Sequence, residues 1–340
     1  MTARIVTLTL NPAIDLATTA PAVRPTHKIR TTGEHVDPGG GGINVARVVH
    51  ALGGDALAVL AAGGATGRFL TELLEEAGVP YRAVPIAGRT RVSFAVRALD
   101  SGAEYRFVPD GPLLSEVEWQ ATLAALDAAE GGFVVASGSL PPGVPADAYA
   151  TAARAAAARG RRFVLDTSGP ALRAALGAGI ALLKPSLGEL ESLVGRPLPD
   201  PAAQEAEALA LVRAGAARMV AVSLGAAGAI LATDAGVLRR PALVGPVQSA
   251  VGAGDAFLAA MVLALAREAA PAEALDWGIA AGAAAVAGVG TARLRREDVT
   301  ARYHTLPHDN DRALPHDNDR APPRDDMDAR SGATTGQAPC

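Results

Sequence analysis

The chain has 340 residues, of which 49% are hydrophobic and 19% are charged, and its mean hydropathy is +0.21. Such a chain can bury a large core, which excludes wholesale disorder, and its length suits one large α/β domain or two smaller ones. The net charge of -4 leaves no broad basic excess, so nucleic acid is not expected as a main partner. The single cysteine, Cys340, excludes an intrachain disulfide and a cysteine-based metal cage, and the composition suits the cytoplasm.

Strands and helices alternate along most of the chain. The N-terminal stretch Arg4–Leu10 is β-branched and alternating, which predicts a strand and not a secretion signal. Further strands are predicted at Ala56–Ala61, Gly132–Ser137, Arg162–Asp166, Ala181–Lys184 and Met219–Ser223. Helices are predicted between them at Gly67–Ala77, Glu116–Ala129, Asp147–Arg159 and Pro201–Ala214. This order predicts a parallel sheet covered by helices on both faces.

Two stretches interrupt this alternation. Residues 16–36 and 89–107 have β-type alternation without an intervening helix, which predicts a small accessory sheet or lid inserted into the main domain. Later in the chain, Ala256–Ala266 and Trp277–Ala292 are apolar but short, and charged residues separate them. We expect both to be buried helices and not membrane spans.

The C-terminal segment differs from the rest of the chain. Residues 306–313, with the sequence LPHDNDRA, recur at once as residues 314–321, and the segment has too few apolar residues to form a core. Residues 305–340 contain seven acidic and four basic residues, so they carry -3 of the net charge of -4. We therefore expect one folded domain over residues 1–304 and a disordered, repetitive tail over residues 305–340.

Glycine-rich loops are the strongest candidates for a functional site, because the histidines have neither metal-type spacing nor a serine or cysteine partner motif. The first loop has four consecutive glycines, Gly39–Gly42, followed by helical spacing from Ile43 to Leu52. Glycines at a helix start let a ligand approach backbone amides, and Asn44 adds a neutral donor and acceptor. A flexible turn is the alternative, which four glycines alone do not exclude.

The second loop, Val251–Phe257, has the sequence VGAGDAF and opens an apolar helix. Amides at the positive end of a helix suit an anion that gains charge during a reaction. A carboxylate there repels phosphate, so Asp255 needs a task, and accepting a proton from an attacking hydroxyl is an obvious one. Capping its own helix is an equally good local interpretation.

The third loop, Ser223–Gly228, has the sequence SLGAAG and follows an apolar strand. The carboxyl edge of a parallel sheet is where ligands usually bind. The sequence is neither a P-loop nor the dinucleotide-binding glycine pattern. A plain strand-turn-strand connection therefore fits this loop about as well as a ligand site does.

The order of six motifs resembles a known family. The motifs are NPAID at 11–15, GGGGINVAR at 39–47, SGSLPPG at 137–143, Lys184–Pro185 with Glu189, SLGAAG at 223–228 and VGAGD at 251–255. Together they resemble the PfkB branch of the ribokinase-like sugar kinases over about residues 3–300, which implies a three-layer α/β/α sandwich with a β-sheet lid. Within the family, the fourth glycine of the GGGG run, Gly42, stands where 1-phosphofructokinases and tagatose-6-phosphate kinases usually have lysine. The chain is therefore most similar to the PfkB-type 6-phosphofructokinases.

The resemblance implies ATP-dependent phosphorylation of fructose 6-phosphate at the 1-hydroxyl, a step of glycolysis. The residues implied in catalysis are Asp255 as the general base and the amides of Gly252, Ala253 and Gly254, which stabilise charge on the transferred group. Sugar-binding residues are expected at Asp15, Gly40, Gly41, Gly42, Asn44 and Ser139. Lys28, Arg30 and Arg91 are candidates for the phosphate already on the substrate. Lys28 and Lys184 are the only lysines of the chain, and both fall at positions where the family binds anions.

The resemblance also implies a nucleotide site, two kinds of metal ion and a subunit contact. Residues expected at the nucleotide are Lys184, Ser186, Ser223, Leu224, Gly225, Gly228, Val247, Ile279 and Ala283. Magnesium is expected through water at Glu189, and potassium is expected on carbonyls near Ser249, Val251, Ala285, Gly288 and Gly290. The lid strands of this family join two subunits, so we expect a homodimer.

Two positions depart from the family pattern. The family's Asn-x-x-Glu motif, which helps to hold magnesium, has Ser186 in place of the asparagine. This shorter side chain is expected to lower magnesium affinity and puts a second, inhibitory nucleotide site in doubt. The threonine that usually precedes VGAGD is Ala250, which removes a hydroxyl near the turn.

Other functions fit parts of the sequence. A 1-phosphofructokinase or a tagatose-6-phosphate kinase is equally compatible with the NPAID motif. A non-catalytic protein that binds a nucleotide or a sugar phosphate is supported only by the two departures, and Asp255 argues against it. A dinucleotide-dependent oxidoreductase ranks last, because the glycine fingerprint is missing.

Overall fold

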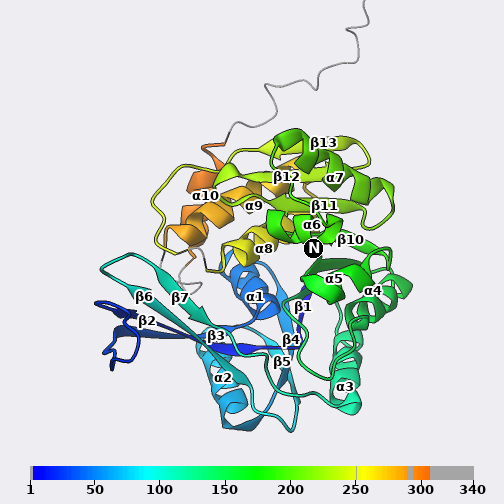
Figure 1. Ribbon diagram of the computed structural model, residues 1–340. Coiled ribbons are helices and arrows are strands. Elements are labelled where there is room, and N and C mark those ends of the chain that lie inside the picture. Colours follow the sequence, from blue (N-terminus) through cyan, green and yellow to red (C-terminus); the bar gives the residue numbers. More distant parts are fainter. Residues whose placement is uncertain (1–2, 250, 289–293, 307–340) are drawn as a thin grey trace, which may run out of the picture. The chain divides into compact units, whose positions relative to one another are not determined.

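The computed structural model describes residues 3–249, 251–288 and 294–306 (Figure 1). These residues fall within one compact unit, Met1–Leu306. Leu306 is buried in the core, so ordered structure continues two residues past the predicted boundary at 304. The tail from residue 307 onward, which is predicted to be disordered, lies outside the described residues. Ala250 and Gly290 lie outside them as well. Within the described ranges, no helix combines the length and apolarity that crossing a membrane requires.

Within the described residues, nine strands form the main sheet, in the order β13-β12-β11-β10-β9-β8-β1-β4-β5. Their bounds are β1 Ile5–Thr9, β4 Ala56–Ala62, β5 Tyr81–Pro85, β8 Phe133–Ser137, β9 Arg162–Asp166, β10 Ile180–Leu183, β11 Met219–Ser223, β12 Ala229–Thr233 and β13 Gly236–Arg240. Neighbours from β5 to β11 pair in parallel, and β12 and β13 add an antiparallel edge. The predicted mainly parallel sheet is therefore confirmed.

Helices cover both faces of this sheet. One face carries α1 Gly41–Ala51, α2 Gly64–Glu76, α8 Ala253–Ala266, α9 Pro271–Val286 and α10 Arg296–Tyr303, and the other carries α3 Glu116–Asp127, α4 Ala148–Ala158, α5 Gly169–Ala175, α6 Leu187–Val194 and α7 Pro201–Arg213. Successive residues of one strand enter opposite cores: Ala58 and Leu60 of β4 face the first set of helices, and Val59 and Ala61 face the second. Because both faces are buried, the inner strands of the sheet are predominantly apolar. The predicted three-layer architecture is confirmed.

A separate sheet of four strands, in the order β3-β2-β6-β7, forms the lid. Its bounds are β2 Ala13–Ala20, β3 Thr32–Gly39, β6 Arg91–Ala98 and β7 Glu104–Phe107. In Figure 1 the strands β2, β6 and β7 extend to the left of the main sheet. The two segments that lack helical spacing thus pair with one another, and the predicted inserted sheet is confirmed.

Helix boundaries differ from the sequence prediction mainly at N-termini that contain glycine or proline. Helix α1 begins at Gly41 and α8 at Ala253, so Asp255 lies inside α8. Helix α9 begins at Pro271, earlier than predicted, because proline is well suited to the first turn of a helix. Helix α9 ends at Val286, so residues 287 and 288 of the predicted helix are not helical.

Candidate active site

A cavity of about 270 Å³ lies where the lid meets the carboxyl ends of β8 and β9. Many of the predicted site residues line it: Asp15, Gly40, Gly41, Asn44, Arg91, Ser139, Glu189, Val251, Gly252 and Asp255. They come from the lid strands, from the N-termini of α1, α6 and α8, and from the loop after β8. The fold therefore brings together residues that are up to 240 positions apart in the chain, as the span from Asp15 to Asp255 shows.

The helices α1 and α8 both begin at this cavity. Their N-cap residues are Gly40, with φ of 109°, and Gly252, with φ of 76°. Both angles lie in a region that glycine adopts readily and other residues avoid. Neither N-terminus has a side-chain cap. The first amides of both helices, which lack intrahelical partners, are thus available to a ligand.

Asp255 lies at the meeting point of the two helices. It is the third residue of α8, and it does not cap the helix; instead, Asn44 Nδ2 of α1 donates to Asp255 Oδ2 at 2.9 Å. Burial raises the pKa of Asp255 to about 7, with a further increase from Asp166, although Asn44 and Lys184 act in the opposite direction. A carboxyl group with a pKa near neutrality is well suited to accept a proton from a substrate hydroxyl.

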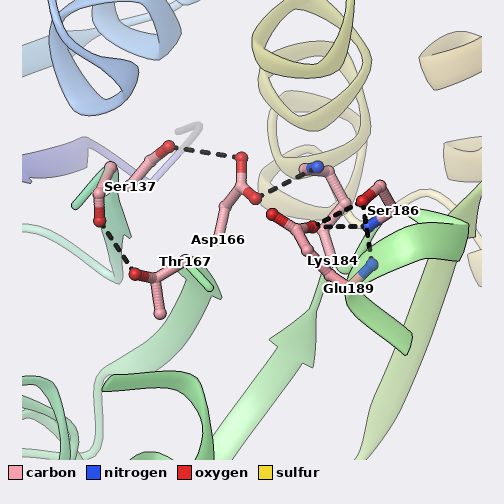
Figure 2. A network of polar contacts seen from close by, with 7 residues as sticks. Ser137, Asp166, Thr167, Lys184, Ser186 and Glu189 are labelled. Atoms are coloured by element: carbon pink, nitrogen blue, oxygen red, sulfur yellow. Dashed lines mark hydrogen bonds and ion pairs between the residues drawn. The ribbon is translucent and has the colours of Figure 1, made fainter. Parts of the chain in front are cut away.

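Lys184 follows β10 and lies buried below the first turn of α8. Its Nζ forms an ion pair with Asp166 Oδ1 at 3.1 Å, and Ser137 Oγ donates to Asp166 Oδ2 at 3.3 Å (Figure 2). Burial opposes the charged ammonium, but Asp166 and nearby carboxylates outweigh it and raise the pKa of Lys184. A Cβ atom on Gly254 would lie 3.6 Å from Nζ, so the positive charge adjoins the open amides of α8.

Ser186 and Glu189 form a closed capping box at the start of α6 (Figure 2). The backbone amide and the hydroxyl of Ser186 donate to Glu189 Oε2 at 2.7 and 2.9 Å. In return, the amide of Glu189 donates to Ser186 Oγ at 3.3 Å. The serine at this position therefore ties one carboxylate oxygen of Glu189 into the helix cap.

The side of the cavity that carries Ser139 and Arg91 is held by Asn11, a residue that the sequence analysis did not assign to the site. Asn11 Nδ2 donates to the carbonyl of Asp110 at 2.8 Å and to Ser139 Oγ at 3.2 Å. The backbone carbonyl of Asn11 accepts a hydrogen bond from Arg91 Nη2 at 2.9 Å. Arg91 Nη1 donates to the backbone carbonyl of Pro109 at 2.7 Å. Asn11 thus fixes two predicted substrate-binding residues at once.

Several other side chains of the cavity were also missed. They are Ser93, Arg106, Ser137, Asp166, Thr167 and Ser168. Asp166 is the last residue of a predicted strand and Thr167 and Ser168 follow it, so the carboxyl end of that strand was a usable signal. Ser93 and Arg106 are contributed by the lid, and their place depends on the register of β6 and β7, which alternation alone does not give.

Three predicted sugar-site residues do not line this cavity. Lys28 and Arg30 are exposed in the loop between β2 and β3. Gly42 is buried inside α1, where a Cβ atom would lie 2.5 Å from Thr9 Oγ1. Gly42 thus allows α1 to approach β1 closely.

The predicted nucleotide residues lie on neighbouring elements. Ser223 pairs with Ser186 in a parallel bridge, and its amide donates to Pro185 O at 3.0 Å. Leu224 and the 3-10 turn η1, Gly225–Ala227, connect β11 to antiparallel β12, with Gly228 closing the turn, so the strand-turn-strand interpretation of SLGAAG also holds. Ile279 and Ala283 are on α9, and Val247 is exposed between β13 and α8.

The described residues predicted at potassium lie around the end of α9. The amide of Ser249 donates to Val286 O at 3.4 Å, which brings the segment before α8 next to Ala285 and Gly288. The carbonyl of Ala285 already accepts from the amide of Gly288 at 3.2 Å. Within the part of the chain that the structure describes, no group of three or more acidic, histidine or cysteine side chains could hold a metal by itself.

A lidded three-layer α/β protein with uncapped helix N-termini around a carboxylate of raised pKa has the site of a phosphoryl-transfer enzyme. Residues 8–297 match the pfkB family carbohydrate kinases, so the chain belongs to this family. The resemblance predicted from the motifs is confirmed.

Individual relatives agree with this assignment. ATP-dependent 6-phosphofructokinase isozyme 2 of Mycobacterium tuberculosis is 46% identical over 298 residues, which are 87% of this chain and 88% of the relative. Two crystal structures of phosphofructokinase-2 from Escherichia coli, in complex with potassium and with fructose-6-phosphate, have TM-scores of 0.85 and 0.84 at 41% and 40% identity. Each match covers 89% of this chain and 99% of the other. Ribokinase from Arabidopsis thaliana, with a TM-score of 0.70, 20% identity and coverage of 89% and 99%, confirms the ribokinase-like fold.

Proposed function

We propose that this chain is an ATP-dependent 6-phosphofructokinase that phosphorylates the 1-hydroxyl of fructose 6-phosphate. The observation that carries the proposal is the convergence of the uncapped N-termini of α1 and α8 on Asp255. The name of the Mycobacterium tuberculosis relative and the fructose-6-phosphate complex of the Escherichia coli protein support the choice of substrate.

In the proposed reaction, Asp255 accepts the proton of the sugar 1-hydroxyl while the oxygen of that hydroxyl attacks the γ-phosphorus of ATP. The bond from that phosphorus to the β,γ-bridging oxygen breaks, and ADP leaves. The amides of Gly252, Ala253 and Gly254 donate to the oxygens of the group in transfer, where charge is spread. A pKa of about 7 leaves much of Asp255 ionised at neutral pH while keeping it basic enough to take a proton.

The sugar is proposed to bind between the lid and α1. Asp15, Asn44 and Ser139 offer hydroxyl-binding groups, and the glycine amides of the α1 N-terminus lie beside them. Arg91 and Arg106 are the lid arginines that border the cavity, so we assign the substrate's 6-phosphate to them. The two carbonyl contacts of Arg91 hold its guanidinium in place before the substrate arrives.

The nucleotide is proposed to bind across α6, the turn after β11 and α9, with Lys184 next to its phosphates. Magnesium prefers oxygen ligands and usually keeps several waters. Asp166 and Glu189 place carboxylates at the cavity, and the two hydrogen bonds from Ser186 engage Oε2 of Glu189, so the donor set fits an ion held through water. When bound, the ion neutralises negative charge on the phosphates. Potassium is proposed near Ser249 and the end of α9, since the Escherichia coli relative was crystallised with it.

We also propose a homodimer that forms through the lid. The lid exposes several large apolar side chains: Val92, Phe94, Tyr105, Phe107 and Val108. A second subunit would remove this surface from water. Lys28 and Arg30 are exposed and do not line the cavity of their own chain, so the sugar-phosphate role predicted for them would place them at the site of another subunit.

The proposed function is tested by comparing kcat/KM for fructose 6-phosphate, fructose 1-phosphate and tagatose 6-phosphate, with ADP release as the signal. The highest value is expected for fructose 6-phosphate. A higher value for either of the other sugars identifies a 1-phosphofructokinase or a tagatose-6-phosphate kinase and overturns the substrate assignment. Absence of any sugar-dependent ADP release overturns the kinase activity and leaves a binding protein.

A further inference from the structure

Strand β6 of the lid connects the candidate sugar cavity to the segment that precedes α8. Arg91 and Ser93 of this strand line the cavity. Residues two positions apart in a strand share a face, so Arg97 lies farther along the same face. Its Nη1 donates to the carbonyl of Gln248 at 2.8 Å. One strand therefore contacts both the sugar cavity and the polypeptide that leads into the anion-binding turn.

A second lid residue contacts the next residue of that segment. Glu104 of β7 is paired directly with Arg97 in the ladder. Its Oε2 accepts from Ser249 Oγ at 3.4 Å, and the same Oγ accepts from the amide of Val251 at 3.2 Å. Val251 immediately precedes Gly252, the N-cap of α8. A continuous series of contacts thus runs from the lid to the amides proposed to bind the transferred phosphoryl group.

The main domain holds the same segment from the other side. The amides of Gln248 and Ser249 both donate to the carbonyl of Val286, at 2.7 and 3.4 Å. Residues 244–248 are exposed, so few other contacts restrain them. Gln248 therefore lies between α9, which its amide contacts, and the lid, which its carbonyl contacts.

We propose that Arg97 and Glu104 are positioning residues that couple the placement of the lid to the geometry of the anion-binding turn. A lid seated on the sugar phosphate holds Gln248 and Ser249, and this fixes the position of Gly252 and its neighbouring amides. A misplacement of about 1 Å at such a site can cost about a hundredfold in rate. The arrangement also favours transfer to the sugar over transfer to water, because the turn is completed when the lid is in place. This inference rests on the proposed function.

The kinetic test uses Arg97→Met, which keeps the apolar stem and removes the donors. We expect kcat to fall about tenfold, as for a lost positioning contact, while KM for fructose 6-phosphate changes less than about threefold. Arg97→Lys, which keeps a donor, is expected to recover part of kcat. The matched control is Arg82→Met. Arg82 also donates to a main-chain carbonyl, that of Ala125, at 3.2 Å, but Arg82 lies on β5 of the main sheet and not on the lid. An unchanged kcat in Arg97→Met, or an equal loss in the control, overturns the proposal.

Amide hydrogen exchange separates this proposal from the proposed function. In the ligand-free protein, Arg97→Met is expected to speed exchange in a peptide covering residues 247–256, and Arg82→Met is not. If the wild-type protein lacks kinase activity but the exchange difference is present, the proposed function fails and the coupling of lid and turn stands. If the wild-type protein is active but exchange in this peptide is the same in all three proteins, the coupling is wrong.

Discussion

Two pairs of helices in this protein begin in different ways. At α3 and α7, the side chains of Ser115 and Asp200 accept from the amide three residues later, as capping residues do. At α1 and α8, a glycine occupies the same position and no side chain closes the N-terminus. The side chains of Ser115 and Asp200 each satisfy an amide of their own helix, whereas α1 and α8 leave the amides of their first turns open at the cavity. An uncapped glycine at the cavity separates these two helix starts from α3 and α7, but α2, which begins at the uncapped Gly63, shows that a missing cap alone does not mark a ligand site.

Helix α6 combines features of both groups. It borders the cavity through Glu189, yet the capping box with Ser186 closes its N-terminus. The comparison can be tested by changing the open termini, where function should be lost, and the capped termini, where stability should be lost.

The largest effect is expected at Asp255, between the two open termini. Asp255→Asn keeps the shape of the side chain but removes the base, and we expect kcat to fall by about a thousandfold or more. Steady-state ADP release measures this loss, and circular dichroism checks that the fold is kept. The matched control is Asp298→Asn, because Asp298 is also the third residue of its helix, α10, but is exposed. Near-normal turnover in Asp255→Asn contradicts the assigned role.

The next largest effect is expected from pH. Because burial raises the pKa of Asp255 to about 7, the base is protonated in more acidic solution. We expect kcat/KM to fall about tenfold per pH unit below 7 and to be level above it. A profile that stays flat down to pH 5 argues against Asp255 as the titrating base.

The same pKa predicts a change in stability. The pKa of Asp255 in the folded protein lies above the ordinary aspartate value of 3.8, so the folded protein binds the proton more tightly than the unfolded chain. Stabilisation from this group is present at low pH and is lost as the pH rises through about 7. Asp255→Asn is therefore expected to raise Tm relative to the wild type at pH 8 more than at pH 5, in paired thermal melts.

The sequence predicted the open termini better than it predicted their surroundings. The glycine runs and Asp255 are local motifs, and α/β alternation predicted the sheet edge where they meet. The ion pair of Lys184 and Asp166 was not predicted, because it joins the ends of two neighbouring strands and depends on their pairing. Arg106 reaches the cavity only through the register of the lid. Lys28 fits the family pattern, but it is exposed and does not line the cavity at Asp255.

A smaller loss of activity is expected when the backbone of an open terminus is changed. Gly252→Ala places a Cβ at φ of 76°, which strains the turn and shifts its amides. We expect stability to fall by about 1 kcal/mol and kcat to fall about tenfold. Gly160→Ala is the matched control, since Gly160 has φ of 68° and no atom within 4 Å of the added Cβ. Equal kcat losses in both variants would show that strain alone, and not the position of the amides, lowers activity.

The smallest effects are expected at the capped termini, where two serines form the same capping box. Ser115→Ala and Ser186→Ala each remove a cap, and each is expected to cost about 1 kcal/mol of folding free energy in denaturant titrations. Only Ser186→Ala also frees Glu189 from its serine hydroxyl, so only this variant should change the magnesium concentration that gives half-maximal activity, by about twofold to threefold. A change in magnesium dependence in Ser115→Ala as well would indicate a general loss of structure. If neither variant changes it, the cap of α6 is structural like that of α3, and the cavity is served by the open helix termini alone.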